Sequence, residues 1–229
     1  MVETMSQTYA IADLHGRFDL LEMALVKIVD HAELPATLVT LGDYVDRGPD
    51  SRQVIERLMG GLNDEDWRLI CLKGNHEDIM WQTCRGIVPD CGWWLTNGGG
   101  ATLISYGQQQ GDEADVTIVP AEHLRWIERL PLMHVDNHRI FVHAGVNPKN
   151  SLDKQDPQDV IWKIYDHRDD SGYGQRHIVH GHDAHAHGPI LKRNRTDLDT
   201  LAWRTGRLVI GVFDNDVPGG PFDILEVRG

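Results

Sequence analysis

Six polar side chains in this 229-residue sequence are of the types that bind divalent metal ions, and each lies close behind a short apolar segment. They are two carboxylates, one carboxamide and three imidazoles, at Asp13, His15, Asp43, Asn75, His143 and His182. Mixed oxygen and imidazole donors suit borderline divalent ions. We therefore predict two such ions per chain, with Mn²⁺ as the first choice and Fe, Zn or Ni as alternatives.

Two ions about 3.5 to 4 Å apart require a bridging carboxylate. Asp43 is the predicted bridge, because it follows an apolar strand directly and its neighbour Gly42 lets the backbone approach closely. An ion pair of this kind lowers the pKa of a bound water, orients a phosphate and stabilises the charge of an in-line displacement. The predicted chemistry is therefore hydrolysis of a phosphate ester or anhydride.

Three further residues are predicted to complete the catalytic site. His76 adjoins Asn75 and is the candidate proton donor to the leaving oxygen. Asp46 is expected to hold the His76 ring in one tautomer. Arg47, in the same segment as Asp43, can bind phosphate oxygens through two parallel hydrogen bonds.

The segments between these residues alternate between strand and helix patterns. Strands are predicted over 9–12, 37–41 and 68–72, with helices over 17–31 and from Pro49 onward. In open α/β sheets, ligand sites gather at the carboxyl ends of the strands. The polar residues occupy such positions three times in the first 75 residues, so we expect them to converge at one sheet edge.

A helical insertion is predicted over 78–130, bordering the active-site cleft, within a single domain that spans 1–229. Strands are expected to resume at 139–142 and 177–179, and two antiparallel strands at 207–213 and 222–227 to close the fold. The predicted class is α/β, or α+β.

Composition excludes several other functions. The net charge of −13 argues against a nucleic-acid-binding module, and no apolar run is long enough to span a membrane. The segment from Met1 to Thr8 lacks the pattern of a secretory signal. Because three cysteines make no even-numbered disulfide framework, a reduced cytoplasmic protein is expected, with a pair between Cys84 and Cys91 as the alternative.

The same residues resemble a known family. Three segments look like the signature blocks of the phosphoprotein phosphatase family of calcineurin-like metallophosphoesterases: 13–16 (Asp-Leu-His-Gly), 42–48 (Gly-Asp-Tyr-Val-Asp-Arg-Gly) and 74–77 (Gly-Asn-His-Glu). Segment 94–100 is similar to the insert of bacteriophage lambda-type and bacterial Ser/Thr protein phosphatases. The resemblance implies a β-sandwich of two mixed sheets flanked by helices.

The resemblance also implies roles. It assigns Asp13, His15 and Asp43 to the first metal, and Asp43, Asn75, His143 and His182 to the second. Three positions depart from the family pattern: Ala12 stands for a usual Gly, Lys73 for a phosphate-binding Arg, and Ile164 for another Arg. Lys73 is kept as a candidate substrate-binding residue that supplies charge without the planar guanidinium.

Three functions stay open at this point. The first is a Ser/Thr protein phosphatase acting on phosphorylated protein, and the alternative is a symmetrical bis(5′-nucleosyl)-tetraphosphatase acting on a nucleotide. The third is a non-catalytic metal-binding scaffold, disfavoured because every ligand and the proton donor are present. His185 and His187 are expected to be solvated loop residues, with metal or substrate contact as the alternative. Core packing is expected for Trp93, Trp94, Trp126 and Trp162, with a substrate groove as the alternative.

Overall fold

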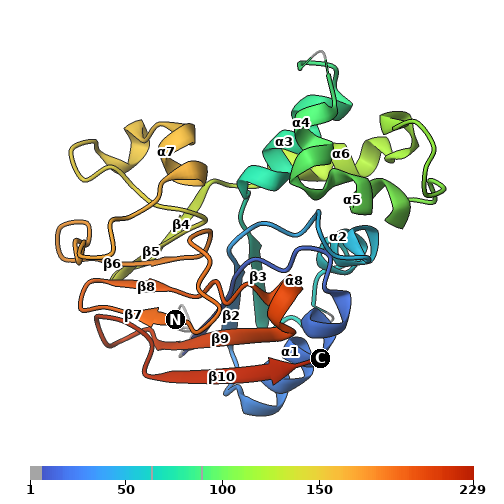
Figure 1. The fold of residues 1–229 in the computed structure, drawn as a ribbon. Coiled ribbons are helices and arrows are strands. Elements are labelled where there is room, and N and C mark those ends of the chain that lie inside the picture. The colour runs from blue at the N-terminus through green and yellow to red at the C-terminus, as the bar shows by residue number, and fades with distance from the viewer. Residues whose placement is uncertain (1–6, 63, 89) are drawn as a thin grey trace.

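The computed structural model describes residues 7–62, 64–88 and 90–229, so most of the N-terminal segment discussed above lies outside the described residues. Two five-stranded mixed sheets form the body of the molecule, with helices around them (Figure 1). The first has strand order β10-β9-β1-β2-β3 and the second β4-β5-β6-β8-β7. The predicted fold class is confirmed.

The first sheet is built from strands that the sequence patterns predict. Its strands are β1 (Gln7–Ile11), β2 (Ala36–Thr40), β3 (Trp67–Cys71), β9 (Arg207–Asp214) and β10 (Asp223–Arg228). The first three are parallel to one another, with Tyr9 opposite Leu38 and Leu38 opposite Leu69. Their carboxyl ends therefore meet at one edge of the sheet.

The second sheet is only partly predicted. Strands β5 (Arg139–Val142) and β6 (His177–His180) fall where expected, and they run parallel. Three short strands were not anticipated: β4 (Met133–Val135), β7 (Ile190–Leu191) and β8 (Arg195–Asp197). Strand β8 reads Arg-Thr-Asp, so it carries no apolar alternation that would indicate a strand.

The two sheets pack face to face over an apolar layer. The buried residues of this layer are Ala10, Ala12, Val39, Leu41, Leu72, Phe141, Val179, Leu198, Val209 and Phe213. Phe141 of one sheet meets Phe213 of the other edge to face, with ring centroids 5.5 Å apart. This layer fixes the two sheets relative to each other, and with them the polar side chains at their edges.

Helices cover the outer faces of the sandwich. α1 (Phe18–His31) and α2 (Ser51–Met59) bury their apolar sides against the first sheet, and α7 (Pro157–Trp162) packs on the second. The short helix α8 (Ala202–Thr205) leads into β9. Among the described residues, no helix combines the length and apolar character that crossing a membrane requires.

A cluster of helices lies beyond α2, at the upper right of Figure 1, and shares one apolar core with the first sheet. It contains α3 (Asn75–Cys84), α4 (Gly92–Trp94), α5 (Gly100–Ser105) and α6 (Ala121–Arg129), with a π-helical turn over Leu95–Gly99. The predicted insertion over 78–130 falls within this cluster. Helix α3 begins at Asn75, however, so one helix runs from the site into the insertion.

Gly98 shows why the glycine-rich segment is needed. Its φ is +108°, and a Cβ at this position would lie 2.7 Å from the backbone nitrogen of Arg47. The carbonyl of Gly98 accepts a hydrogen bond from that same Arg47 N–H, at 3.2 Å. Only glycine allows this approach, which brings the helical cluster against the loop that carries Asp46 and Arg47.

Candidate dinuclear metal centre

The six predicted ligands come from loops at the carboxyl ends of strands in both sheets. In the first sheet, Asp13 and His15 follow β1, Asp43 follows β2 and Asn75 follows β3. In the second sheet, His143 follows β5 and His182 follows β6. All but His182 are buried. The predicted convergence at one edge is therefore present in the structure.

Backbone strain is concentrated in these same loops. Among the described residues, seven non-glycine residues have a left-handed φ, and six of them are predicted site residues: Asp13 (40°), His15 (42°), Asp43 (54°), Asp46 (73°), Arg47 (69°) and His182 (68°). Such conformations cost about 1 to 3 kcal/mol each and persist where the surrounding structure enforces them. Their concentration here indicates loops selected for side-chain placement rather than for stability.

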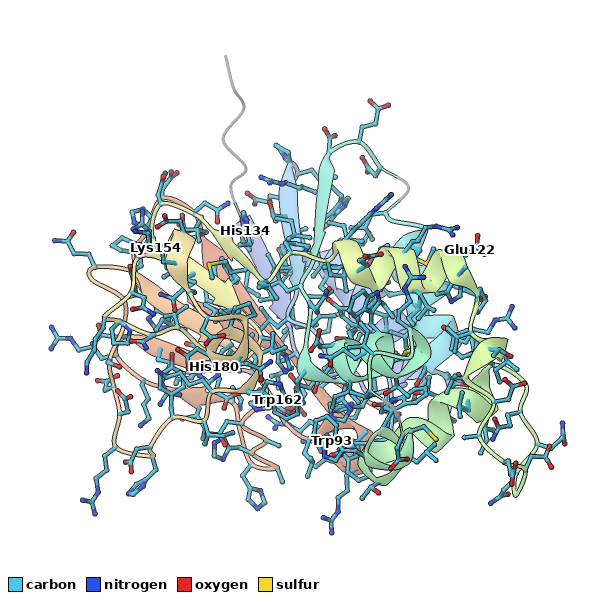
Figure 2. The ribbon with its side chains drawn as sticks, turned by 90° about the horizontal axis from the view of Figure 1, so that it is seen from above. Trp93, Glu122, His134, Lys154, Trp162 and His180 are labelled. Atoms are coloured by element: carbon cyan, nitrogen blue, oxygen red, sulfur yellow. The ribbon has the colours of Figure 1, made fainter. Side chains whose placement is uncertain are left out.

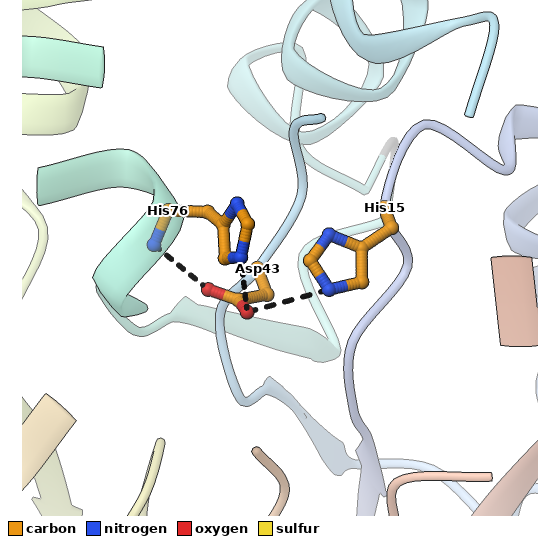
Figure 3. A group of neighbouring side chains, drawn as sticks. All are labelled: His15, Asp43 and His76. Carbon is orange, nitrogen blue, oxygen red and sulfur yellow. Dashed lines mark hydrogen bonds and ion pairs between the residues drawn. The ribbon is translucent and has the colours of Figure 1, made fainter. Parts of the chain in front are cut away.

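Asp43 lies at the centre of the group. Its Oδ2 is 3.4 Å from Nε2 of His15, and its Oδ1 is 3.5 Å from Nε2 of His143 (Figure 3 shows the His15 side). Each ring directs its Nδ1 at a backbone carbonyl, that of Val45 for His15 and that of Leu41 for His143. A carbonyl only accepts hydrogen bonds, so Nδ1 carries the proton and Nε2 presents a lone pair to the carboxylate.

This arrangement fits bound cations. Burial lowers the pKa of both rings, which favours their neutral form, while the pKa of Asp43 is lowered in spite of its burial, which favours the ionised carboxylate. Neutral imidazole lone pairs and an ionised carboxylate repel one another at these distances unless a cation lies between them. Asn75 adds a third oxygen, its Oδ1 lying 2.9 Å from Nε2 of His143.

Ligand atoms gather in two groups that share Asp43. One contains His15, Asp43 and His76, and the other contains Asp43, His143 and His182, with ligand atoms within 4.8 Å of one another in each group. A carboxylate common to both groups is what a bridging ligand requires. Gly42 makes room for it, because its φ is +102° and a Cβ there would lie 2.6 Å from the backbone nitrogen of Gly74.

His76 and Asp46 form the contact expected of an oriented proton donor. His76 Nδ1 lies 2.7 Å from Asp46 Oδ2, and Asp46 also accepts hydrogen bonds from Trp94 Nε1 and Thr102 Oγ1. Burial acts to lower the pKa of His76, but the carboxylates of Asp43 and Asp46 outweigh it, and the net pKa is raised. The ring is therefore suited to carry a proton near neutral pH.

Arg47 reaches the centre and Lys73 does not. The two terminal nitrogens of Arg47 lie 2.6 Å from Nε2 of His15 and 3.0 Å from Nε2 of His76. The ammonium of Lys73 instead contacts the Glu128 carbonyl at 3.4 Å. Phosphate binding by Lys73 stays a prediction.

Asp13 is placed differently from the other ligands. It belongs to neither group around Asp43, and its carboxylate accepts the backbone N–H of His182, at 3.2 Å from each oxygen. Burial raises its pKa well above the ordinary value, and the carboxylates of Asp199 and Asp43 raise it further. Asp13 thus ties the first sheet to the loop that carries His182.

Glu77 is a supporting residue whose role was not expected from the sequence. Its buried carboxylate accepts hydrogen bonds from the backbone N–H groups of Asp43 (2.8 Å), Tyr44 (2.7 Å) and Gly74 (2.9 Å). These contacts lock the Asp43 loop onto the start of α3. The available signal was its position, since it follows two predicted site residues in the block 74–77.

Some of the other expectations from the sequence are confirmed and others are wrong. Trp94 is buried as predicted, but Trp93 is 56% exposed, so core packing is wrong for it. His187 is an exposed loop residue as expected, whereas His185 is only half exposed and lies against two aspartates. Cys71, Cys84 and Cys91 are all free thiols.

Comparison with known proteins agrees with this geometry. The sequence profile of one family, described as Calcineurin-like phosphoesterase, matches residues 7–209. A symmetrical bis(5′-nucleosyl)-tetraphosphatase of Nitrosospira multiformis is 32% identical over 152 residues, which are 64% of this chain and 46% of that protein. The protein of the same name from Pseudomonas fluorescens is 29% identical over 163 residues, 64% of this chain and 44% of its own length. The chain thus spans about half the length of these curated relatives.

Solved structures support the fold. A crystal structure provisionally named a diadenosine tetraphosphatase superposes with a TM-score of 0.68 at 22% identity, covering 100% of this chain and 96% of that one. A protein serine/threonine phosphatase from Saccharomyces cerevisiae gives 0.61 at 16% identity, covering 98% and 80%. At these identities the likeness concerns the fold alone.

Proposed function

The chain belongs to the calcineurin-like phosphoesterase family, and on that premise we propose that it is a hydrolase that cleaves phosphate esters or anhydrides with two divalent ions held around Asp43. The observation that carries this proposal is the Asp43 carboxylate, contacted on one oxygen by His15 and on the other by His143. Asp13 and Asn75 would complete the two ligand sets. The donor chemistry suits Mn²⁺, Fe²⁺ or Zn²⁺.

Bound divalent ions would supply an acidified water and neutralise the charge of the phosphate. The residues of the chain do the remainder. Arg47 binds two phosphate oxygens and orients the phosphorus for attack in line with the leaving group. His76 gives the proton on Nε2 to the leaving oxygen as its bond to phosphorus breaks, while Asp46 holds the other nitrogen.

Within this reaction class we infer that the preferred substrate is a dinucleoside tetraphosphate, cleaved with water into two nucleoside diphosphates. From the sequence alone, phosphoprotein hydrolysis is the first expectation. The names of the two curated relatives favour the alternative instead.

An aromatic pair beside the centre, with Trp93 exposed and Trp162 partly buried, also favours a nucleotide. Trp93 stacks on Trp162 with ring centroids 5.7 Å apart and planes 27° apart, and the two lie where the helical cluster faces the second half of the chain (Figure 2). Trp162 is in turn edge-on to His182, at 6.1 Å between centroids. The two indoles line a groove of about 400 Å³ together with Asp78, Ile79, Gln82 and Gln158. Stacking on an aromatic side chain is a general way to bind a base.

The test compares two substrates on Mn²⁺-loaded protein. We expect kcat/KM for diadenosine tetraphosphate to exceed that for a phosphoserine peptide by about 100-fold or more, with ADP as the sole product. Trp93→Ala should raise KM for the tetraphosphate about 10-fold, within the range of one lost stacking contact, while hydrolysis of p-nitrophenyl phosphate stays unchanged. Trp93→Phe is the matched control. A preference for the peptide would assign the chain to protein dephosphorylation.

A further inference from the structure

A second cluster of metal-binding side chains lies outside the groups around Asp43. It consists of Asp183 and His185, on the loop after β6, and Asp197, the last residue of β8. Nε2 of His185 lies 3.6 Å from Oδ2 of Asp183 and 3.8 Å from Oδ2 of Asp197. One ligand atom from each residue lies within 4.8 Å of the other two.

Asp197 shows that this is more than a set of surface acids. The residue is only 1% exposed. Its Oδ1 accepts the backbone N–H of Asp199 at 2.9 Å, but its Oδ2 is buried and, within the described part of the chain, accepts no hydrogen bond. A buried carboxylate oxygen without a donor is costly unless a cation compensates for it. This oxygen faces His185.

The cation nearest along the strand does not compensate for Asp197. Arg195 directs one terminal nitrogen at Nε2 of His180, at 2.8 Å, and the other at the carbonyl of Asp169, also at 2.8 Å. Because successive side chains of a strand alternate in direction, Arg195 and Asp197 share a face but are separated by one full repeat. Both terminal nitrogens of the guanidinium are engaged by these partners, and none of its hydrogen bonds goes to Asp197.

The loop that carries His185 is held in place by its own backbone. The N–H of His185 donates to the carbonyl of Asp199 at 3.1 Å, and its carbonyl accepts the N–H of Gly188 at 2.7 Å. The ligands are therefore positioned before anything binds. The His185 side chain is 41% exposed, so an ion can enter from solvent.

We propose that Asp183, His185 and Asp197 hold a further divalent cation, distinct from the ions around Asp43. One imidazole and two carboxylates, with a fourth position open to water, suit Zn²⁺ or Mn²⁺. The ion joins the loop that follows His182 to the end of β8, and so fixes the position of that loop against the second sheet.

The test counts metal per chain. Chelated protein is loaded with Zn²⁺, desalted and measured by mass spectrometry of the metal, for the wild type and for the double variant Asp183→Asn with His185→Gln. The variant should hold one ion fewer than the wild type, whatever the total. His187→Gln is the matched control, since it changes an exposed histidine of the same loop and should leave the count unchanged. An equal count in the wild type and the double variant overturns the proposal.

Asp197→Asn gives a second, independent result. It removes a buried charge, so in chelator the variant should unfold at a temperature no lower than the wild type, and this also shows that it folds. After loading it should again hold one ion fewer. A variant of unchanged stability that retains the wild-type count would show that Asp197 binds no metal.

Discussion

The two sheets supply the two halves of one site by different means. In the first sheet, the buried polar residues of β1 and β2 are all threonines, and the site loops are set by backbone contacts, such as Gly42 against Gly74 and the N–H groups bound by Glu77. In the second sheet, buried polar side chains occur within the strands themselves: Arg139, His177, His180, Arg195, Thr196 and Asp197. Among these, His180 pairs with Arg195 and His177 with Thr196, which are distant in sequence. We therefore expect mutations in the first sheet to act mainly through the metal ligands. Mutations of the buried polar residues in the second sheet should act through the hydrogen bonds that hold the sheet.

The largest effect on metal binding and activity is expected at Asp43, the residue common to the two ligand groups. Asp43→Asn removes the charge common to both groups, so we expect loss of both ions around it and a fall in activity of more than about 100-fold, since even outer partners of metal ligands cost 10- to 100-fold. His15→Asn and His143→Asn, one from each half, should each lose a single ion. Metal counts on dialysed protein measure this. Two ions still bound around residue 43 in Asp43→Asn would exclude the bridge.

A mutation of His76 distinguishes between two roles for this residue, metal ligand and proton donor. It lies in one of the two ligand groups, yet its ring is paired with Asp46. We expect His76→Asn to keep the metal count and to lower kcat for a dinucleotide substrate by about 10²- to 10⁴-fold, the scale of a lost general acid. With p-nitrophenyl phosphate the loss should be smaller, because that leaving group needs little protonation. A lower metal count would make His76 a ligand instead.

The contrast between the sheets also explains what the sequence could predict. In the first sheet, apolar runs such as 37–41 end at polar residues, and both the strands and the convergence of Asp13, Asp43 and Asn75 were anticipated. Strand β8 was missed because its buried residues are polar, and nothing local in Arg-Thr-Asp shows that Arg195 pairs with His180 and Thr196 with His177. The cluster of Asp183, His185 and Asp197 was missed for the same reason, since the pairing of β6 with β8 brings it together.

Mutations of Arg139 in the second sheet and Ile11 in the first show whether the two sheets are stabilised differently. Both are buried strand residues. The guanidinium of Arg139 donates hydrogen bonds to the carbonyls of Gly219 (2.9 Å), Asp214 (2.9 Å) and Val217 (2.5 Å), and these bonds hold the turn between β9 and β10. We expect Arg139→Met to lower the free energy of unfolding by about 3 kcal/mol, since those carbonyls lose a charged donor. Ile11→Val removes one methylene from the first sheet and should cost about 1 kcal/mol.

Urea unfolding of chelated protein measures both changes without a contribution from bound metal. Arg139→Lys keeps the charge but cannot reach three carbonyls at once, so its loss should fall between those of the other two variants. If Arg139→Met were no more destabilised than Ile11→Val, the hydrogen bonds of the second sheet would add little net stability. The two sheets would then differ in how they position the metal ligands, and burial of apolar side chains would stabilise both sheets equally.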